Sequence, residues 1–462
     1  MKFELILTVV VFIILFIQII SKQKNTSGLL HFVNVLLLLN LIAGFVLNKD
    51  GMLFNGMFHT NSLVATEKNI LNLGTLIISM QSYNWLKNHE HMLEFYLLLL
   101  CTLLGMFFML SAGNFMIFYL GLELSTIPLA AMVNFNLHER RSSEGALKLI
   151  MSSAFSSGLL LLGLSFIYGT CGSLDFGTIS RNLQATPLQL FSLVLLLGGF
   201  AFKLSVAPFH LWTADVYEGA PVAVTAYLSV ISKGAFFFAL LPVLYVVFKP
   251  LSGNWYPVLF ALSVLTMLIG NFFALRQANL KRLLAFSSIS QAGFIIIGIS
   301  GSSREGAASM IYFLLVYIFS NLGAFGVIGL ISSLTGKERI DDYRGLYNTN
   351  PFLCWVFGIS LFSLAGVPPT AGFFGKFFLL LAGAGAGNYV LITIAALNMI
   401  VSLYYYLVLV KAMFIDANDS PVQKLNVHIL PKLAMVICVT GIMLCGVLSW
   451  FYEYIYALSP GF

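Results

Sequence analysis

The sequence predicts an all-α integral membrane protein with about fourteen transmembrane helices. Three observations predict this fold class: 59% of the 462 residues are hydrophobic, only 9% are charged, and the mean hydropathy is +0.93. Soluble proteins carry about 25% charged residues, so this chain has too few polar atoms to cover a surface that faces water. Because one bilayer crossing takes about 20 apolar residues, the chain has room for a dozen or more spans and for no sizeable soluble domain.

Fourteen apolar segments follow one another along the chain. The first begins after Lys2 and is closed by Lys22 and Lys24, with no small-residue cleavage site, so we expect a retained span rather than a signal peptide. The third begins in a polar stretch, and the seventh and twelfth are long and contain proline. The expected spans are 3–21, 29–47, 64–86, 92–111, 113–135, 144–168, 187–214, 221–248, 255–275, 281–300, 307–334, 350–381, 387–414 and 429–456.

Basic residues in the loops predict the orientation. The odd-numbered loops hold thirteen of them, whereas the N-terminus and the even-numbered loops hold five. Cytoplasmic loops are enriched in Lys and Arg, so we expect a multi-pass membrane protein with the odd-numbered loops in the cytoplasm and both termini on the outer side. The Lys and Arg residues occur singly or in twos and threes between apolar runs, which argues against nucleic acid as a partner. The thirteen are Lys22, Lys24, Lys87, Arg140, Arg141, Arg276, Lys281, Arg282, Lys337, Arg339, Arg344, Lys411 and Lys424; the five are Lys2, Lys49, Arg181, Lys249 and Arg304.

Four further lysines lie inside apolar segments, where an ammonium group costs at least about 2.5–3.5 kcal/mol. Among the acidic residues we expect only one, the glutamate of FYLGLELSTIPLA, to lie as deep. Four lysines cannot all pair with one carboxylate, so repulsion and desolvation favour loss of a proton from some of them. The set predicts a proton relay, with a structural ion pair as the alternative for any single pair. The residues are Lys148, which lies nearest a span start and is the weaker candidate, Lys203, Lys233, Lys376 and Glu123.

Two other lysines, Lys68 and Lys432, lie near span ends, where we expect their side chains to reach the interface.

Prolines predict a break in two of the spans. Pro208 lies in KLSVAPFHLW, and Pro368 and Pro369 lie in AGVPPTAGFFGKF. Proline removes a helix hydrogen bond and frees carbonyl groups, which are tolerated at membrane depth only where they face protein or water. Lys203 precedes Pro208 by five residues and Lys376 follows Pro369 by seven. A simple kink is the alternative for either site alone, but paired breaks near lysines are typical of a transporter built from repeats.

Polar residues around the breaks could hold a file of waters between the lysines. Any one of them is as well explained by an interhelical hydrogen bond. His210 is the only histidine close to a break, which makes it a candidate proton carrier near neutral pH, with a structural role as the alternative. The other polar residues are Ser205, Thr225, Ser229, Ser232, Ser287, Ser288, Ser290, Gln291, Asn321 and Tyr405.

The sequence contains no motif for a cofactor or a metal. It has no GxxxxGK[ST] motif, no cysteine cluster for iron–sulfur ligation and no histidine spacing for a metal site. We therefore expect no redox centre, cofactor or metal on this chain. A proton path without its own energy source must be driven by a gradient or by partner subunits.

Four segments carry a family resemblance. KLSVAPFHLWTADVYEGAPVAVTAYLSVISKGAFF (203–237), NLKRLLAFSSISQAGF (279–294), GVPPTAGFFGKF (366–377) and FYLGLELSTIPLA (118–130) resemble the antiporter-like subunits of respiratory complex I. Among these the chain is most similar to subunit N of bacterial NADH:quinone oxidoreductase, over about residues 90–415.

The resemblance implies fourteen helices with spans 7 and 12 broken and two inverted five-helix repeats. Its boundaries would be 1–91 for spans 1–3, 92–248 for spans 4–8, 249–415 for spans 9–13 and 416–462 for span 14. It also implies a translocase subunit that moves protons through Glu123 paired with Lys203, then Lys233, then Lys376. Quinone reduction would occur elsewhere, with NADH, FMN, iron–sulfur clusters and quinone in partner subunits, among them neighbouring antiporter-like subunits. A lysine at position 376 favours subunit N over subunit M.

The chain departs from the family pattern at Gln291, where many relatives carry histidine, and at Phe286, often tyrosine. An obligatory titrating group at position 291 is therefore in doubt, although an amide can order a water. Two alternatives remain open. One is a subunit of a multi-subunit Na⁺/H⁺ antiporter or of a membrane-bound hydrogenase, and the other is a membrane scaffold that transports nothing.

Overall fold

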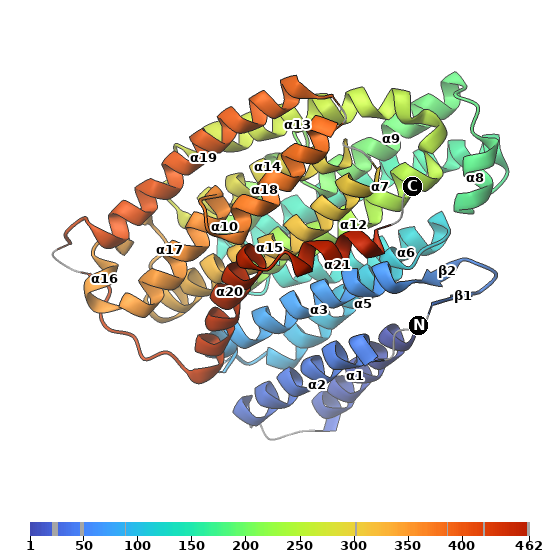
Figure 1. The fold of residues 1–462 in the computed structure, drawn as a ribbon. Helices are drawn as coiled ribbons and strands as arrows, with labels where there is room; N and C mark the ends of the chain where they lie inside the picture. The colour runs from blue at the N-terminus through green and yellow to red at the C-terminus, as the bar shows by residue number, and fades with distance from the viewer. Residues whose placement is uncertain are drawn as a thin grey trace.

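The computed structural model of the chain describes residues 1–20, 26–46, 50–87, 89–300, 303–385, 387–418 and 421–459. Within these ranges the chain forms a bundle of long helices with one β hairpin at its edge, as Figure 1 shows. The hairpin pairs β1 (Gly51–Leu53) with β2 (Phe58–Thr60) in antiparallel register. The predictions that concern Lys22, Lys24 and Lys49 lie outside the described residues.

Helices occupy all fourteen expected spans, which confirms the predicted fold class. Eleven helices of the described residues are long and apolar enough to cross a membrane. The other three spans are the polar third helix and the two broken ones. The first seven spans and their connections contain α1 (Lys2–Ile20), α2 (Thr26–Val46), α3 (Ser62–Gln81), α4 (Tyr83–Leu86), α5 (Met92–Leu110), α6 (Phe115–Val133), α7 (Arg140–Cys171), α8 (Phe176–Asn182), α9 (Pro187–Lys203) and α10 (Leu211–Gly219).

The eighth span alternates between α-helical and π-helical turns. Pro242, which cannot donate a backbone hydrogen bond, lies at the end of the second α-helical stretch, and a π-helical stretch follows it. Another π-helical stretch ends directly before Lys233. The segments are α11 (Val222–Ala226), η1 (Tyr227–Ser232), α12 (Lys233–Pro242) and η2 (Val243–Val247).

The remaining spans surround two almost wholly buried helices at the centre, α14 and α15. Asn279 begins α14 because its side chain accepts hydrogen bonds from the backbone N–H groups of Lys281 and Arg282. The elements of this half are η3 (Lys249–Leu251), α13 (Ser252–Ala274), α14 (Leu280–Ile299), α15 (Ser303–Thr335), η4 (Ile340–Tyr343), α16 (Leu346–Thr349), α17 (Pro351–Ala365), α18 (Ala371–Gly385), α19 (Tyr389–Phe414), α20 (Ile429–Val447) and α21 (Trp450–Leu458).

Both proline sites break their helices, as predicted. In the seventh span α9 ends at Lys203 and α10 begins at Leu211, and the Ala207–Pro208 peptide bond between them is cis. In the twelfth span α17 ends before Gly366, whose φ of +87° is left-handed, and α18 begins after the cis Pro368–Pro369 bond. Pro208, Pro368 and Pro369 are themselves exposed. Carbonyl groups that the breaks free are nevertheless bonded by protein, because Phe202 accepts from Trp212 Nε1, and Leu364 and Ala365 accept from Lys376.

Glycines bring two pairs of helices into backbone contact. A Cβ atom added at Gly105 of α5 would lie 2.4 Å from the backbone nitrogen of Ser125 in α6. One added at Gly270 of α13 would lie 2.5 Å from the backbone nitrogen of Ser290 in α14. Small residues allow membrane helices to approach this closely. The same contact therefore recurs in the fourth and fifth spans and in the ninth and tenth, although the predicted division into two repeats stays a prediction.

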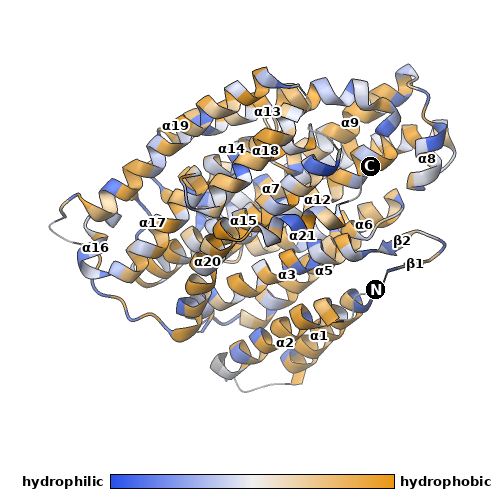
Figure 2. Cartoon of the chain, viewed as in Figure 1, coloured by the Kyte–Doolittle hydropathy of each residue, from blue (hydrophilic) through white to orange (hydrophobic). Residues whose placement is uncertain are grey.

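Apolar side chains cover the outside of the bundle. Figure 2 shows hydrophobic residues along the outer helices, and exposed examples include Ile20 of α1, Phe155 of α7 and Ile400 of α19. A surface of this kind suits lipid and would be unstable in water. The buried polar residues lie inside this apolar shell.

Candidate functional site

Lys203 lies at the C-terminal end of α9, at the first break. Its ammonium group donates hydrogen bonds to Thr126 Oγ1 of α6 at 2.9 Å and to Ser153 Oγ of α7 at 2.6 Å. Its side chain is 9% exposed and lies 5.9 Å from the centre of the Phe236 ring of α12. The break thus places a charged group among hydroxyls from two neighbouring helices.

Glu123 lies one turn before Thr126 on α6, close enough for its charge to act on Lys203. No ion pair within 4.0 Å joins the two residues in the part of the chain that the structure describes, because hydroxyl groups already occupy two of the ammonium donors. One carboxylate oxygen of Glu123, Oε1, is buried with no hydrogen-bond partner. The expected pair is therefore close but not in direct contact.

Lys233 lies at the centre of the eighth span, directly after the π-helical stretch. It is 3% exposed and donates to Ser288 Oγ of α14 at 2.8 Å, while the Tyr217 ring of α10 lies 5.4 Å from the ammonium group. Phe236, which contacts Lys203, is one turn further along α12. Helix α12 therefore carries Lys233 and contacts Lys203 through Phe236.

Lys376 uses the carbonyl groups that the second break has freed. It is wholly buried and donates to the carbonyl oxygens of Leu364 at 2.8 Å and Ala365 at 3.1 Å, at the C-terminal end of α17. Gln291 of α14 donates to the same Leu364 oxygen at 3.2 Å. The Phe294 ring of α14 lies 5.0 Å from the ammonium group.

Helix α14 therefore connects two of the predicted lysines. Ser288 contacts Lys233, Gln291 shares a carbonyl with Lys376, and Phe294 contacts Lys376. These three residues are three positions apart, so they lie along one side of the helix. Residues of α12 and α14 thus connect three buried lysines, Lys203, Lys233 and Lys376, which we call the lysine row.

Lys148 was expected to be buried within its span, and the structure shows that it is not. Its side chain is 41% exposed and forms ion pairs with Glu144 at 2.7 Å and with Asp215 of α10 at 2.6 Å. Asp215 also pairs with Arg282 at 2.9 Å, and Arg282 pairs with Glu218 at 2.8 Å. Lys148 is near the end of its span, so its long side chain reaches these charges at the edge of the bundle.

Sequence reasoning gave Asp215 and Glu218 no role, although both lie in the DVYEGAP stretch. The signal that could have found them is two acidic residues next to a broken span. Their partners come from α7 and α14, which only the tertiary structure brings together.

His210 occupies the position before α10, next to the first break. Its ring is 7% exposed, and its Nδ1 atom has no hydrogen-bond partner. The ring is close enough to Lys233 for their charges to interact. The structure therefore places His210 beside the lysine row, and its role stays a prediction.

Two expectations about the third span are wrong. Lys68 does not reach the interface: it is wholly buried and pairs with Glu4 of α1 at 2.5 Å. Glu123 is also not the only deep acidic residue, because Glu4 and Glu67 are 2% and 4% exposed. Glu4 was not expected to be buried because it lies near the chain start, but α1 packs against α5 and the Lys68 side chain of α3 reaches Glu4.

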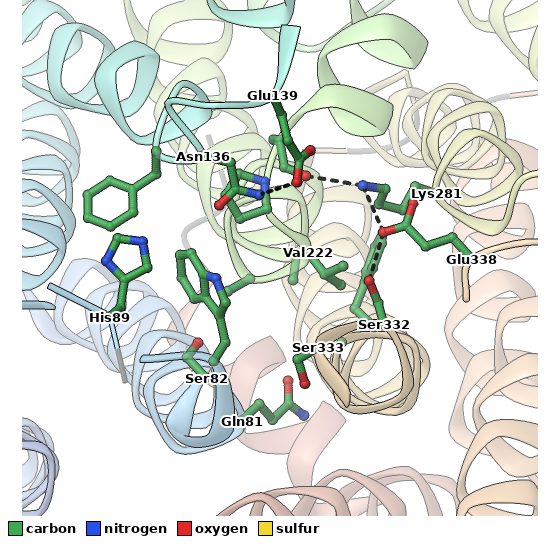
Figure 3. A pocket seen from close by; sticks show the side chains of 18 of the residues that line it. Gln81, Ser82, His89, Asn136, Glu139, Val222, Lys281, Ser332, Ser333 and Glu338 are labelled. Atoms are coloured by element: carbon green, nitrogen blue, oxygen red, sulfur yellow. Dashed lines mark hydrogen bonds and ion pairs between the residues drawn. The ribbon is translucent and has the colours of Figure 1, made fainter. Parts of the chain in front are cut away.

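A cavity of about 740 Å³ opens at the end of the bundle that carries the loops before α5 and α7. Figure 3 shows polar side chains around it, among them His89, Glu139, Lys281 and Glu338. Lys281 pairs with Glu338 at 3.1 Å. Burial and the charge of the neighbouring His91 lower the pKa of His89, against the opposite effect of nearby acids. Titratable groups thus line this opening.

The inner wall of the cavity approaches the lysine row. Ala226 of α11 and Phe325 of α15 line it, and one turn deeper Ser229 donates to Asn321 Oδ1 at 3.0 Å. Tyr317, a further turn along α15, has its hydroxyl beside Ser288. Ser288 is the residue that holds Lys233.

The chain resembles known proteins over most of its length. Residues 112–402 match the family described as NADH:quinone oxidoreductase/Mrp antiporter, TM. NADH-quinone oxidoreductase subunit N of Phocaeicola vulgatus is 46% identical over 457 residues, which cover 98% of this chain and 97% of that protein. A chain of respiratory complex I from Thermus thermophilus with bound aureothin is 29% identical, with a TM-score of 0.84 and 97% of both chains covered. A chain of the Mrp complex from Dietzia sp. DQ12-45-1b shares the fold, with a TM-score of 0.88 at 20% identity and 99% and 97% of the two chains covered.

Proposed function

Because the chain belongs to the NADH-quinone oxidoreductase subunit N family and is a membrane subunit of that proton-translocating complex, we propose that it moves protons along the row Lys203, Lys233 and Lys376. One observation carries this proposal: on one side of α14, Ser288 accepts a hydrogen bond from Lys233, and Gln291 donates to the same Leu364 carbonyl as Lys376. These contacts give a proton a polar partner at each step between two buried lysines.

Protons enter from the cavity. From its inner wall they pass Ser229 and Asn321, then Tyr317, and reach Ser288 and Lys233. The hydroxyl of Ser288 accepts from Lys233 and donates to the carbonyl of Ala285, so it must rotate to hand a proton onward. The Asn321 Nδ2 and Tyr317 hydroxyl atoms are buried without a protein hydrogen bond, and water is the usual partner of such groups.

Glu123 controls the first lysine. A protonated Lys203 is stabilised by the two hydroxyls that accept its hydrogen bonds and by the negative charge of Glu123. When a charge or movement arriving from a neighbouring subunit weakens that support, Lys203 releases its proton toward Lys233. His210, beside the break, exchanges protons with the same region, and Lys148 acts from the edge of the bundle through its ion pair with Asp215.

The row spans two repeats, 92–248 and 249–415. Along the chain these repeats lie between an N-terminal unit, 1–91, and a C-terminal unit, 416–462. The recurrence of the glycine contact in α5 with α6 and in α13 with α14 supports this division. In this arrangement Lys203 and Lys233 belong to the first repeat and Lys376 to the second. The proton therefore crosses from one repeat to the other through α14.

Quinone reduction supplies the energy from other subunits, which hold NADH, FMN, iron–sulfur clusters and quinone. The chain contacts neighbouring antiporter-like subunits and has both termini on the outer side of the bacterial inner membrane. The distribution of basic residues among the loops supports this orientation. The cavity opens among the loops that this distribution predicts to be cytoplasmic.

The test is proton pumping by the assembled complex with Lys203→Ala and, separately, Glu123→Gln. We expect both variants to assemble and to pump more slowly, and unchanged pumping in both would refute the relay. The double variant Glu123→Leu with Lys203→Leu distinguishes a subunit that transports protons from one that is only a scaffold. A scaffold would keep its function when a matched pair is exchanged for packing, whereas a relay would lose it.

A further inference from the structure

A buried ion pair lies outside the lysine row, in the N-terminal helices. The ammonium group of Lys68 in α3 contacts Glu4 Oε1 of α1 at 2.5 Å and forms a hydrogen bond with Ser111 Oγ at the end of α5. The two charged side chains are 0% and 2% exposed. Figure 1 shows the β hairpin on the same side of the molecule as the start of α1, and the Phe58 ring of β2 lies 5.4 Å from the ammonium group.

Other titratable groups surround the pair. Glu67, the neighbour of Lys68 on α3, is 4% exposed, and the amino group of Met1 lies 3.2 Å from Glu4 Oε2. On the hairpin, His59 is half-buried, and both its burial and the charge of Lys68 lower its pKa. The hairpin therefore places an imidazole between the buried pair and the aqueous side of the membrane.

Polar residues lead from the pair toward the centre of the bundle. Lys68, Asn72, Thr75 and Ser79 recur every three or four residues, so they lie on one face of α3. Asn72 is 0% exposed, and neither its side-chain oxygen nor its nitrogen has a hydrogen-bond partner. Asn40 of α2 has the same properties.

This face of α3 reaches the eighth span. Thr75 lies beside the hydroxyl of Tyr227, which accepts a hydrogen bond of 2.8 Å from Thr102 of α5. Tyr227 begins the π-helical stretch that ends before Lys233, and Ser229 of the same stretch bonds Asn321. Polar groups thus recur between the Glu4–Lys68 pair and the eighth span, which carries Lys233.

A structural ion pair alone does not account for these residues. A pair that only holds α1 against α3 needs two charges and a few hydrogen bonds. Each buried polar group left unsatisfied destabilises the fold, so amides such as Asn40 and Asn72 would weaken a purely structural contact. Groups of this kind are retained where they are hydrated and functional.

We propose that the Glu4–Lys68 pair is a further proton-binding site, connected through Asn72, Thr75 and Tyr227 to the lysine row and, through His59, to the aqueous side that carries the hairpin. A proton that arrives along α3 binds the Glu4 carboxylate and leaves the Lys68 ammonium without its counter-charge. Lys68 then gives its proton to His59, which releases it, and takes the proton of Glu4. One proton enters, one leaves, and the pair is restored. This inference rests on the proposed function.

The test uses the complete complex in inverted membrane vesicles and measures protons moved per NADH oxidised. The informative variant is the double replacement Glu4→Leu with Lys68→Leu, because removing both partners leaves neither charge of this ion pair buried alone, and we expect the complex to assemble. Thr66→Val is the matched control, since its hydroxyl only bonds the Ser62 carbonyl of its own helix. We expect a lower proton-to-NADH ratio in the double variant and an unchanged ratio in the control.

A normal ratio in the assembled double variant would overturn the inference. The variant His59→Gln, at a half-buried position on the hairpin, gives a second measurement that leaves the Glu4–Lys68 pair in place, and we expect slower acidification of the vesicles. Infrared difference spectra should contain a carboxyl band that disappears in Glu4→Gln, and its absence from the unaltered complex would also refute the site. Lys233→Ala is measured in parallel: if it stops pumping while the double variant pumps normally, the inference fails and the proposed relay stands.

Discussion

Replacing Gln291 with leucine is the sharpest test of the row. The residue lies midway along the side of α14 that joins Lys233 to Lys376, where it donates to the Leu364 carbonyl and lies beside the Tyr406 hydroxyl. Leucine has a similar size and no polar atom. We expect the variant to fold and assemble, because the Leu364 oxygen keeps its hydrogen bond from Lys376.

The size of the effect follows from the geometry. Between Ser288 and Phe294 the helix rises about 9 Å at 1.5 Å per residue, and Gln291 provides the polar group at the midpoint. A proton crossing this stretch beside leucine loses one polar partner, which costs about 1–3 kcal/mol for a buried group. Added to the barrier, this cost slows transfer about 5- to 150-fold.

The assay measures NADH-driven acidification of inverted vesicles together with NADH oxidation. Gln291→His should retain most of the pumping rate, because imidazole also offers a donor and an acceptor. Ser300→Ala is the matched control, since the hydroxyl of Ser300, directly after α14, bonds the Ile297 carbonyl of that helix. Normal pumping by the assembled leucine variant would refute the route along α14.

Three further outcomes are expected. Gly105→Val should destabilise the contact of α5 with α6 by about 1–3 kcal/mol and lower the yield of assembled complex, whereas Gly158→Ala should be neutral because nothing lies within 4 Å of its added Cβ. Asp215→Asn weakens two partly exposed ion pairs and should cost about 1 kcal/mol after screening, measured as a lower melting temperature of the complex, and Glu144→Gln should cost less. His428→Ala removes a ring stacked on Tyr83 at 3.9 Å and should cost about 0.5–1.5 kcal/mol, seen in the same melting curves; an unchanged melting temperature would contradict that estimate.

Most of the fold could be predicted from the sequence because hydropathy and proline act locally. The spans and both breaks follow from runs of apolar residues and from Pro208, Pro368 and Pro369. Burial depth was harder. Lys68 and Lys148 lie at comparable distances from span ends, yet one is wholly buried and the other is 41% exposed.

The difference between these lysines arises in the tertiary structure. Lys68 is enclosed because α1 and the hairpin cover it, whereas Lys148 extends toward acidic residues on α7 and α10. Glu4 and Asp215 are far from their lysines in the sequence, and only Glu144 is close to its own. The hydrogen bonds of Lys376 were likewise not predictable, because they come from carbonyl groups and not from side chains.

The backbone contacts at Gly105 and Gly270 also affect how force travels through the molecule. Two helices joined without intervening side chains bend less than two helices separated by flexible ones, and packed interiors transmit strain because they compress little. A push on the loop before Leu280 is therefore delivered near Phe294, about 21 Å along α14, as a shift of the whole helix. We therefore expect α13 and α14 to move together as one stiff unit. Phe294 of this unit lies 5.0 Å from the ammonium group of Lys376, so such a movement would reach that lysine.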